Sequence, residues 1–237
     1  MYLIALTLLI LFIAALTKAT LGFGESILAI PLLTLVLGLQ VAVPLMGLLA
    51  GAITLMLLVK GWHRVDFQAS WRLLLGAAVG VPVGVWGLKT LPTVWTTTGL
   101  GIFLIFVGLY NLTQPSLKGL YGKQWPYLFG FVAGTLGGAY NIASPPILVY
   151  GIARRWSPQE FRFTLQSFFL PLSAIILISH AGAGLWTIWV FQLFALSLPI
   201  MVLAFWLGNR FSRMMTVQHF ERIVYGGLIV LGIALLV

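Results

Sequence analysis

The amino-acid sequence predicts an all-α polytopic membrane protein of two inverted-topology repeats, each with about five helical elements and together about 8–10 transmembrane segments. Of its 237 residues, 61% are hydrophobic and only 7% are charged, which leaves too few polar side chains for a water-soluble surface. The apolar runs are continuous and do not alternate with polar residues, which favours helices over a lipid-embedded barrel. A motif rich in glycine and ending in proline occurs once in each half of the chain.

Five apolar segments follow one another in the first half, and several of them reach or approach the roughly 20 residues that a membrane-spanning helix needs. The fourth segment carries glycines on one helical face, which favours close packing against another helix in lipid. These glycines are Gly76, Gly80, Gly84 and Gly87. The five segments cover approximately Leu3–Leu16, Ile27–Leu39, Val41–Val59, Leu73–Leu88 and Val94–Leu112.

The second half repeats this order after a polar link. We therefore predict an N-terminal repeat over residues 1–112, a linker over 113–125 and a C-terminal repeat over 126–237, which together form one membrane domain. The apolar segments of the second half cover approximately Pro126–Gly134, Ile147–Ile152, Phe163–Ile178, Trp186–Leu207 and Ile223–Val237.

The positions of the basic residues predict the orientation in the membrane. If every element crosses, all of the 13 Lys and Arg residues except Lys18 and Lys89 fall on one side. Cytoplasmic loops carry an excess of Lys and Arg, so both termini are expected outside the cytoplasm, and an odd number of crossings inverts the second repeat relative to the first. One alternative stays open. The first two elements of each half, at roughly 14 residues or 21 Å, are short for a ~30 Å hydrocarbon core and can instead enter and return on the same side.

The composition excludes several kinds of site. No cysteine is present, so disulfides, thiolate metal ligands and thiol chemistry are excluded. The net charge of +9 is explained by basic cytoplasmic loops, without nucleic acid as a partner. No His, Asp and Glu cluster has metal-ligand spacing and no nucleophile can be paired with a base, so we expect no metal, no cofactor and no enzymatic activity. We assign no function to the three histidines, His63, His180 and His219.

The two copies of the glycine–proline motif cover Thr20–Pro31 and Thr135–Pro146. Glycine frees the backbone for conformations that other residues avoid, and proline cannot donate the hydrogen bond that continues a helix. Broken helices at corresponding places in the two halves of a membrane protein indicate a transporter's substrate site. Four residues recur at the same spacing, with Thr20, Leu21, Gly22 and Pro31 returning as Thr135, Leu136, Gly137 and Pro146.

We predict that the two breaks meet and bind an anion. Unwound backbone offers free N–H groups, and a helix that starts there presents a partial positive charge of about half a unit. N–H donors and small hydroxyls can then hold an anion without a full positive side chain. The alternative is that glycine and proline here only kink helices or pack them closely. The predicted substrate-binding residues are Gly22, Phe23, Gly24, Glu25, Ser26, Gly138, Tyr140, Asn141, Ser144, Arg162 and Gln166.

Lys18 and Glu25 are the most unusual residues of the chain, because ionisable groups at membrane depth are costly and commonly functional. Glu25 is the candidate for carrying a coupling proton. For Lys18 three roles are open: it can pair with Glu25, attract an anion, or extend its charged end to the membrane interface. Arg162 is either a substrate ligand or gate, or a charge that sets the topology, and Gln166 lies one turn further on the same face.

At the two breaks the sequence resembles the sulfite exporter TauE/SafE family, also called the toluene sulfonate uptake permease family. The matching stretches are Gly22–Leu33, Gly137–Tyr150 and Trp156–Arg162. The resemblance implies a bacterial inner-membrane, multi-pass transporter of sulfur-containing anions such as sulfite, sulfoacetate or aromatic sulfonates. The chain departs from the family's pattern at Glu25 and Ser144, where many members have glycine.

The expected function is therefore a secondary transporter that exports a sulfur oxyanion, coupled to protons through Glu25, with alternating access around a midplane site. Its partners would be the small anion, protons and membrane lipid, and the oligomeric state is open. An uncoupled channel for anions or small solutes is the main alternative, and a membrane assembly subunit is a third. A metal or ammonium permease is disfavoured, because acidic residues are scarce in the apolar segments.

Overall fold

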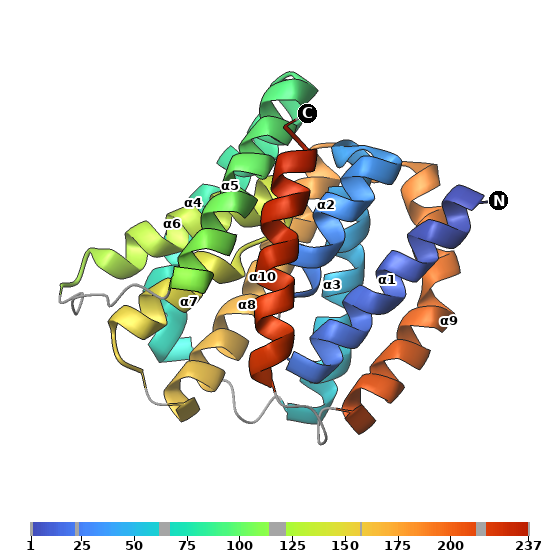
Figure 1. Ribbon diagram of the computed structural model, residues 1–237. Coiled ribbons are helices and arrows are strands. Elements are labelled where there is room, and N and C mark those ends of the chain that lie inside the picture. Colours follow the sequence, from blue (N-terminus) through green and yellow to red (C-terminus); the bar gives the residue numbers. More distant parts are fainter. Residues whose placement is uncertain are drawn as a thin grey trace. The chain divides into compact units, whose positions relative to one another are not determined.

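The computed structural model describes residues 2–21, 24–61, 67–113, 122–156, 158–211 and 217–236. Within these ranges every regular element is an α-helix (Figure 1), which confirms the predicted all-α fold. The helices are α1 (Tyr2–Leu21), α2 (Glu25–Leu37), α3 (Leu39–Gly61), α4 (Phe67–Thr90), α5 (Thr93–Thr113), α6 (Trp125–Tyr140), α7 (Ser144–Ala153), α8 (Pro158–Gly182), α9 (Ile188–Phe211) and α10 (Val217–Ala234).

Helix lengths decide which elements can cross a bilayer. Among the described residues, four helices are long and apolar enough to cross a membrane. Their apolar stretches are Tyr2–Ala19, Ser70–Thr90, Thr93–Thr113 and Ile188–Gly208. Helices α2 and α7, with 13 and 10 residues, are only about 20 Å and 15 Å long at 1.5 Å per residue, so neither crosses a ~30 Å hydrocarbon core alone. The second element of each half is therefore short, as predicted.

The prediction of a short first element is wrong for α1. This helix has 20 residues, or about 30 Å, and not the shorter segment Leu3–Leu16. The polar residues beyond Leu16 did not end it, because they find partners nearby. The Thr17 hydroxyl donates to the carbonyl of Ile13 at 2.8 Å, one turn back in the same helix. Lys18, one residue further on, pairs with Glu25 at the start of α2.

The order of the helices in the second half follows that of the first. A short helix stands second in each half, as α2 and α7, and three long helices follow it. Prolines lie inside α2, α3 and α4, and again at the start of α7 and inside α8 and α9. This agreement supports the repeat at residues 1–112 and 126–237, which stays a prediction.

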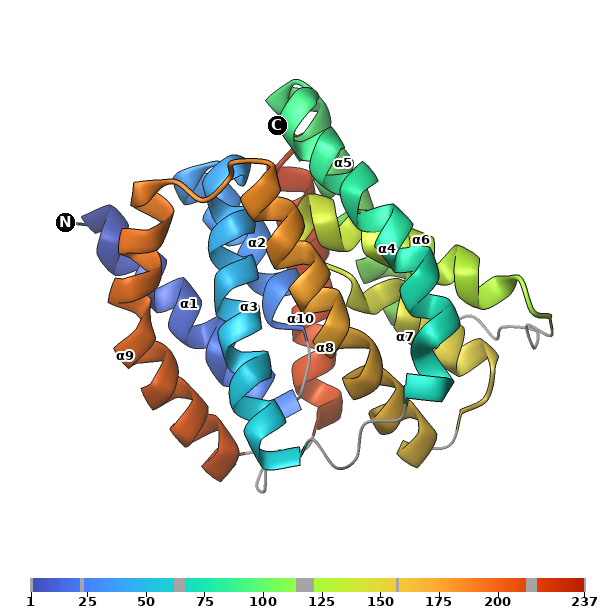
Figure 2. The same ribbon diagram turned by 180° about the vertical axis from the view of Figure 1, so that it is seen from behind.

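The chain forms two compact units, and each takes segments from both halves of the sequence. Unit 1 comprises Met1–Met46, Leu91–Pro115 and Trp186–Val237, and unit 2 comprises Gly47–Thr90 and Ser116–Leu185. In unit 1, α1 packs against α9 and α2, and α5 packs against α10 (Figures 1 and 2). In unit 2, α4 packs against α6 and α8, and α6 also contacts α7.

Helices α4 and α6 of unit 2 touch backbone to backbone. A Cβ atom on Gly76, Gly80 or Gly84 of α4 would lie 2.0–2.2 Å from a carbonyl oxygen of α6. The oxygens belong to Tyr127, Phe131 and Thr135, in the same order along the chain, so the two helices run parallel. The prediction that this glycine face packs closely against another helix is confirmed for these three positions.

The contact is reciprocal, because α6 presents its own glycines to α4. Gly130, Gly134 and Gly138 face the carbonyl oxygens of Leu73, Ala77 and Val81, which a Cβ atom would approach to 2.1–2.4 Å. Such distances are far inside van der Waals contact, so any larger residue must push the helices apart. Without side chains between them, the helices gain dispersion contacts between their backbones along this stretch, and such packing drives helix association in lipid.

Unit 1 uses glycine in the same way at fewer positions. Gly101 of α5 and Gly232 of α10 face each other, and a Cβ atom on either would lie 2.7–2.8 Å from the other's carbonyl oxygen. On α9, a Cβ atom at Gly208 would lie 2.5 Å from the Cβ atom of Ala19 in α1. Small residues therefore lie at the contact in both of these helix pairs.

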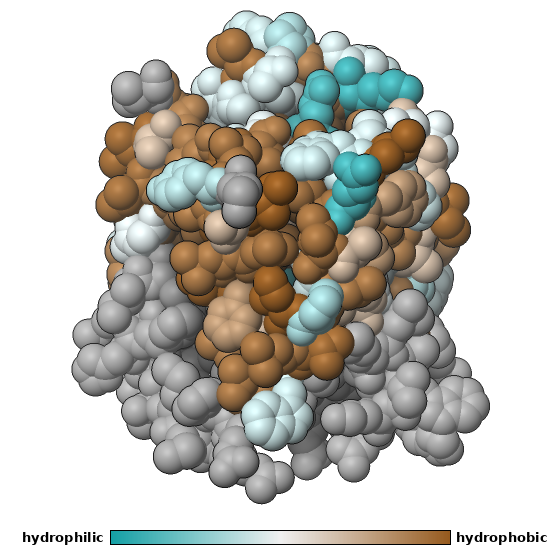
Figure 3. All heavy atoms as spheres, turned by 90° about the vertical axis from the view of Figure 1, so that its right-hand side faces the viewer, coloured by the Kyte–Doolittle hydropathy of each residue, from teal (hydrophilic) through white to brown (hydrophobic). Residues whose placement is uncertain are grey.

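Apolar side chains also cover the outside. Between a polar upper edge and the residues drawn in grey, the coloured residues in Figure 3 are mainly hydrophobic. Large apolar residues are exposed on α1 at Leu9 and Ile13, and on α9 at Val202, Leu203 and Trp206. Apolar surface of this extent is unfavourable in water and is covered by lipid tails in a bilayer. The chain is therefore an all-α polytopic membrane protein.

We predict that Gly80→Ala or Gly134→Ala separates α4 from α6, because the new Cβ atom meets backbone that cannot move aside. Each change should lower the free energy of unfolding by about 1–3 kcal/mol or more. Thermal unfolding of the detergent-purified protein measures this. The matched control is Gly182→Ala in the same unit, where a Cβ atom meets nothing within 4 Å. Equal stability of all three variants would contradict the proposed contact.

Candidate functional site

The first break lies between α1 and α2. Helix α1 ends at Leu21, and α2 begins at Glu25. Gly24 stands between them with φ 91°, a left-handed conformation that glycine adopts without steric cost. The predicted site residues Gly22 and Phe23 lie outside the described residues. The described part of the first motif is thus a helix interruption, as the sequence predicted.

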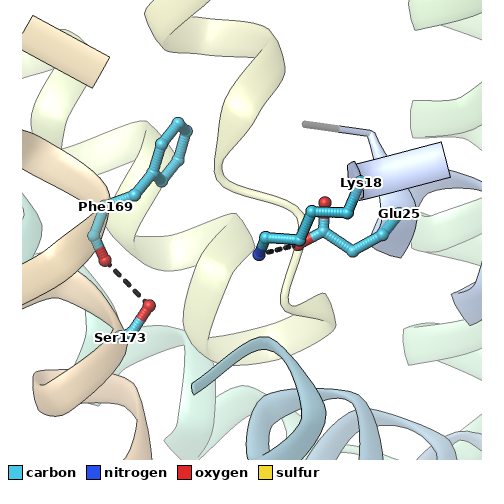
Figure 4. Close-up of polar contacts among 4 residues, drawn as sticks. All are labelled: Lys18, Glu25, Phe169 and Ser173. Atoms are coloured by element: carbon cyan, nitrogen blue, oxygen red, sulfur yellow. Dashed lines mark hydrogen bonds and ion pairs between the residues drawn. The ribbon is translucent and has the colours of Figure 1, made fainter. Parts of the chain in front are cut away.

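A buried ion pair links the two helices of this break. The ammonium group of Lys18 in α1 contacts carboxylate oxygen Oε1 of Glu25 in α2 (Figure 4). Their side chains are only 10% and 9% exposed, respectively. Of the three roles considered for Lys18, pairing with Glu25 is the one that the structure contains. The pair neutralises two charges that would each be costly alone at this burial.

The local structure of α2 also favours a carboxylate at Glu25. This residue occupies the first turn of the helix, where the backbone N–H groups give the end a partial positive charge. Gly24 offers no side chain that could cap them. Ser26, the next residue and another predicted ligand, is buried. A cation, a carboxylate and a hydroxyl-bearing residue therefore gather at the first break.

The second break lies between α6 and α7. Helix α6 ends at Tyr140, and Asn141 follows with φ 54°, again left-handed. The N–H of Asn141 donates to the Gly137 carbonyl at 2.8 Å, and that of Ile142 donates to the Leu136 carbonyl at 3.3 Å. These bonds turn the chain out of the helix. Asn141 suits the position, because Asn tolerates the left-handed conformation better than most residues.

Helix α7 starts at Ser144 with few backbone donors. The next two residues, Pro145 and Pro146, suit the first turn of a helix but carry no N–H group. Side-chain donors must therefore carry more of any anion binding here than the sequence analysis assumed. Ser144 is buried at this helix start, and Asn141 and Tyr140 are partly buried before it. A hydroxyl, an amide and a phenol thus stand around the second break.

Gly138 has two structural contacts at this break. On one side it packs against α4, where a Cβ atom would lie 2.3 Å from the carbonyl oxygen of Val81. On the other, its own carbonyl oxygen lies 3.0 Å from ring nitrogen Nε2 of His180 in α8. Packing and hydrogen bonding explain why glycine stands here. A direct contact of Gly138 with substrate stays a prediction.

His180 makes a contact that the sequence did not predict. It was assigned no function, yet its side chain is fully buried and bonded to one of the predicted site residues. No local pattern could reveal this contact, because 42 positions separate the two residues. Only the packing of α8 against α6 brings them together.

The remaining predicted residues are placed only in part. Arg162 and Gln166 lie in α8, and their side chains are outside the described part of the structure. The first break belongs to unit 1 and the second to unit 2, so the meeting of the two breaks stays a prediction. Among the described residues, no three His, Asp or Glu side chains are grouped so that they could hold a metal ion.

Comparisons with known proteins match almost the whole chain. The model of the sulfite exporter TauE/SafE family covers residues 7–235. The chain is 28% identical over 174 residues to the "Probable sulfite/organosulfonate exporter TauE" of Cupriavidus necator, covering 70% of this chain and 68% of that protein. It is 27% identical over 178 residues to the "Probable inner membrane transporter protein TsaS" of Comamonas testosteroni, covering 73% and 74%. No solved structure matches the chain.

The buried pair of the first break predicts a distinctive pattern of stability. Lys18→Met or Glu25→Gln leaves one uncompensated buried charge, so each should lower the free energy of unfolding by about 3–5 kcal/mol. The double variant removes both charges and should be close to the wild type. Thermal unfolding of the purified protein, without added anions, completes this double-mutant cycle. Additive losses in the double variant would show that the two charges do not interact.

Proposed function

Because the chain belongs to the sulfite exporter TauE/SafE family of membrane transporters, we propose that it is an inner-membrane secondary transporter that exports sulfur-containing anions. The proposed substrates are sulfite, sulfoacetate and other organosulfonates. One relative is named as a sulfite/organosulfonate exporter and another as an inner membrane transporter, which supports this class. Transport requires no enzymatic step.

The observation that carries the proposal is the chemistry of the two helix breaks. In an otherwise apolar protein, each break concentrates polar groups: Lys18 and Glu25 at the first, and Asn141 and Ser144 at the second. A sulfonate or sulfite group has several oxygens that accept hydrogen bonds in different directions. An ammonium, an amide and a hydroxyl are donors of the right kind for it.

We propose that the substrate lies at the bilayer midplane between the two breaks, and that the repeats rock around it. Gly22, Phe23, Gly24, Ser26 and Tyr140 would line this site, and Gly138 would fix its backbone. Arg162 and Gln166 of α8 would add donors. With both termini outside the cytoplasm, the basic loops face inward. The inward-negative potential then favours export of whatever net negative charge crosses, by about 2.3 kcal/mol per charge per 100 mV.

Proton coupling follows from the ion pair in this proposal. While Glu25 is ionised it occupies Lys18, and the ammonium cannot serve a substrate. A proton on Glu25 breaks the pair and frees Lys18 for the anion. Proton and anion therefore assist each other's binding, and this linkage is reciprocal. The burial of both side chains strengthens the effect, because water screens the charges only weakly there.

Binding tests the substrate class. We expect sulfite or an organosulfonate to raise the melting temperature, since a ligand present at 100 times its Kd stabilises by about 2.7 kcal/mol. A thermal-shift series with sulfite, thiosulfate, sulfoacetate, taurine and sulfobenzoate measures this. Asn141→Ala and Ser144→Ala should each weaken binding by about tenfold or more, the cost of one charge-assisted hydrogen bond.

Ser173→Ala is the matched control for these variants. Ser173 lies in α8 of the same unit as Asn141 and Ser144, but its hydroxyl donates to the Phe169 carbonyl of its own helix at 2.8 Å (Figure 4). Its removal should leave binding unchanged. If the Asn141 and Ser144 variants bind like this control, the site does not lie at the second break.

Transport in liposomes tests the coupling. We expect wild-type protein to bind sulfoacetate more tightly as the pH falls, and to accumulate it when a proton gradient is imposed. In Glu25→Gln, Lys18 is free at every pH, so anion exchange should continue while accumulation by the gradient disappears. Glu25→Asp keeps a titrating group and should retain coupling. Gradient-driven accumulation by Glu25→Gln would exclude Glu25 as the proton carrier, and non-saturating wild-type flux would indicate a channel.

A further inference from the structure

We propose that His180 is a positioning residue of the transport site. Its ring holds the second helix break open through the carbonyl of Gly138, and so sets where Asn141 and Ser144 stand. The inference rests on the proposed function, because it assigns a role within that site. It concerns unit 2 alone, to which all four residues belong.

The break leaves the Gly138 carbonyl without its helical donor. If α6 continued, the N–H of Ile142, four residues on, would donate to this oxygen. That N–H donates instead to the Leu136 carbonyl at 3.3 Å. His180 supplies the replacement, with Nε2 at 3.0 Å from the Gly138 oxygen. The imidazole therefore satisfies the acceptor that the break exposes, and so stabilises the end of α6 before Asn141.

Burial makes the imidazole difficult to replace. His180 is completely inaccessible, so water cannot take its place at the carbonyl. Because the acceptor is a carbonyl oxygen, Nε2 carries the proton of this bond. The other ring nitrogen, Nδ1, is buried and has no hydrogen-bond partner among the described residues. The ring therefore makes one polar contact, and that contact is at the break.

A glycine on α3 provides the space for the ring. A Cβ atom at Gly47 would lie 3.2 Å from Nδ1 of His180, so a larger residue would press on the imidazole. One turn further along α3, a Cβ atom at Gly51 would lie 2.7 Å from Cδ1 of Leu177, one turn before His180. The two glycines thus face the two α8 side chains in reverse order along the chain. The imidazole is therefore packed against α3 at Nδ1 and contacts the break at Nε2.

The position of the break determines the position of the proposed ligands. Asn141 is in a left-handed conformation, and helical extension through it would replace that conformation. Ser144 would then move, because only Ile142 and Ala143 join Asn141 to α7. Loss of the His180 donor should consequently weaken anion binding, although His180 itself touches no anion in this proposal.

Two variants at position 180 test this mechanism. In His180→Gln, the side-chain amide nitrogen can lie near the position of Nε2 and donate to the carbonyl oxygen of Gly138. In His180→Leu, the ring is replaced by an apolar side chain without a donor. With sulfoacetate as probe, we expect the Kd of the Gln variant to stay within about threefold of wild type and that of the Leu variant to rise about tenfold or more.

The matched control is Leu177→Ala. It weakens the packing of the same helix face against α3 but leaves the Gly138 contact intact. It should lower the melting temperature while the Kd of the folded protein stays within about twofold of wild type. If His180→Leu also lowers only the melting temperature, or if the Gln variant binds as weakly as the Leu variant, the proposal is overturned.

A second measurement tests the proposal even if the variants at position 180 do not fold. Wild-type protein labelled with ¹⁵N in its histidines reports the ring nitrogens directly, and His63→Gln with His219→Gln leaves the His180 signals alone. We expect Nε2 to carry a proton and its signal to shift when sulfoacetate is added. If the anion binds but the Nε2 signal does not shift, the proposed role of His180 is refuted. If wild-type protein binds none of the sulfur anions, the proposed function fails instead.

Discussion

The backbone contact between α4 and α6 is the constraint on which the second break depends. Six glycines place the two helices so close that carbonyl oxygens of each face the α-carbons of the other. Apolar side chains gain nothing by leaving lipid for another apolar surface, so this close approach takes the place of a hydrophobic driving force. The contact continues to Gly138, three residues before the left-handed Asn141. The end of α6 is thereby fixed against α4 at the point where the chain leaves the helix.

The two breaks accommodate polar groups in an apolar protein in different ways. At the first, Lys18 and Glu25 cancel each other's charge. At the second, the groups are neutral. The Gly138 carbonyl accepts from His180, and two prolines remove N–H groups that would otherwise need acceptors. Burying an unpaired polar group is costly, and both the ion pair and the Gly138 carbonyl avoid this cost, whereas Nδ1 of His180, which has no partner among the described residues, does not. The repeated motif thus carries similar backbone interruptions but different side-chain chemistry.

Features that depend on neighbouring residues could be predicted from the sequence, whereas contacts between residues far apart in the chain could not. The ten apolar segments, the two interruptions and the glycine face of α4 each follow from residues close in sequence. Each segment overlaps a described helix, although α1 is longer than predicted, and the glycine face makes its contact at Gly76, Gly80 and Gly84. The partner of that face could not be predicted, because many helices could receive it. His180 shows the same limit, since nothing near it in sequence points to Gly138. The Lys18–Glu25 pair was one of three open roles, because sequence spacing does not distinguish an ion pair from a charge that extends to the membrane surface.

The neutrality of the Lys18–Glu25 pair has an electrical consequence. A single buried charge that moved through the membrane field would gain or lose about 2.3 kcal/mol per 100 mV, so voltage would hold an empty carrier in one conformation. A cation and an anion that move together feel almost no net force. The unloaded protein can then return at a rate that does not depend on the membrane potential, and the potential acts only on the net charge of the anion and proton bound together.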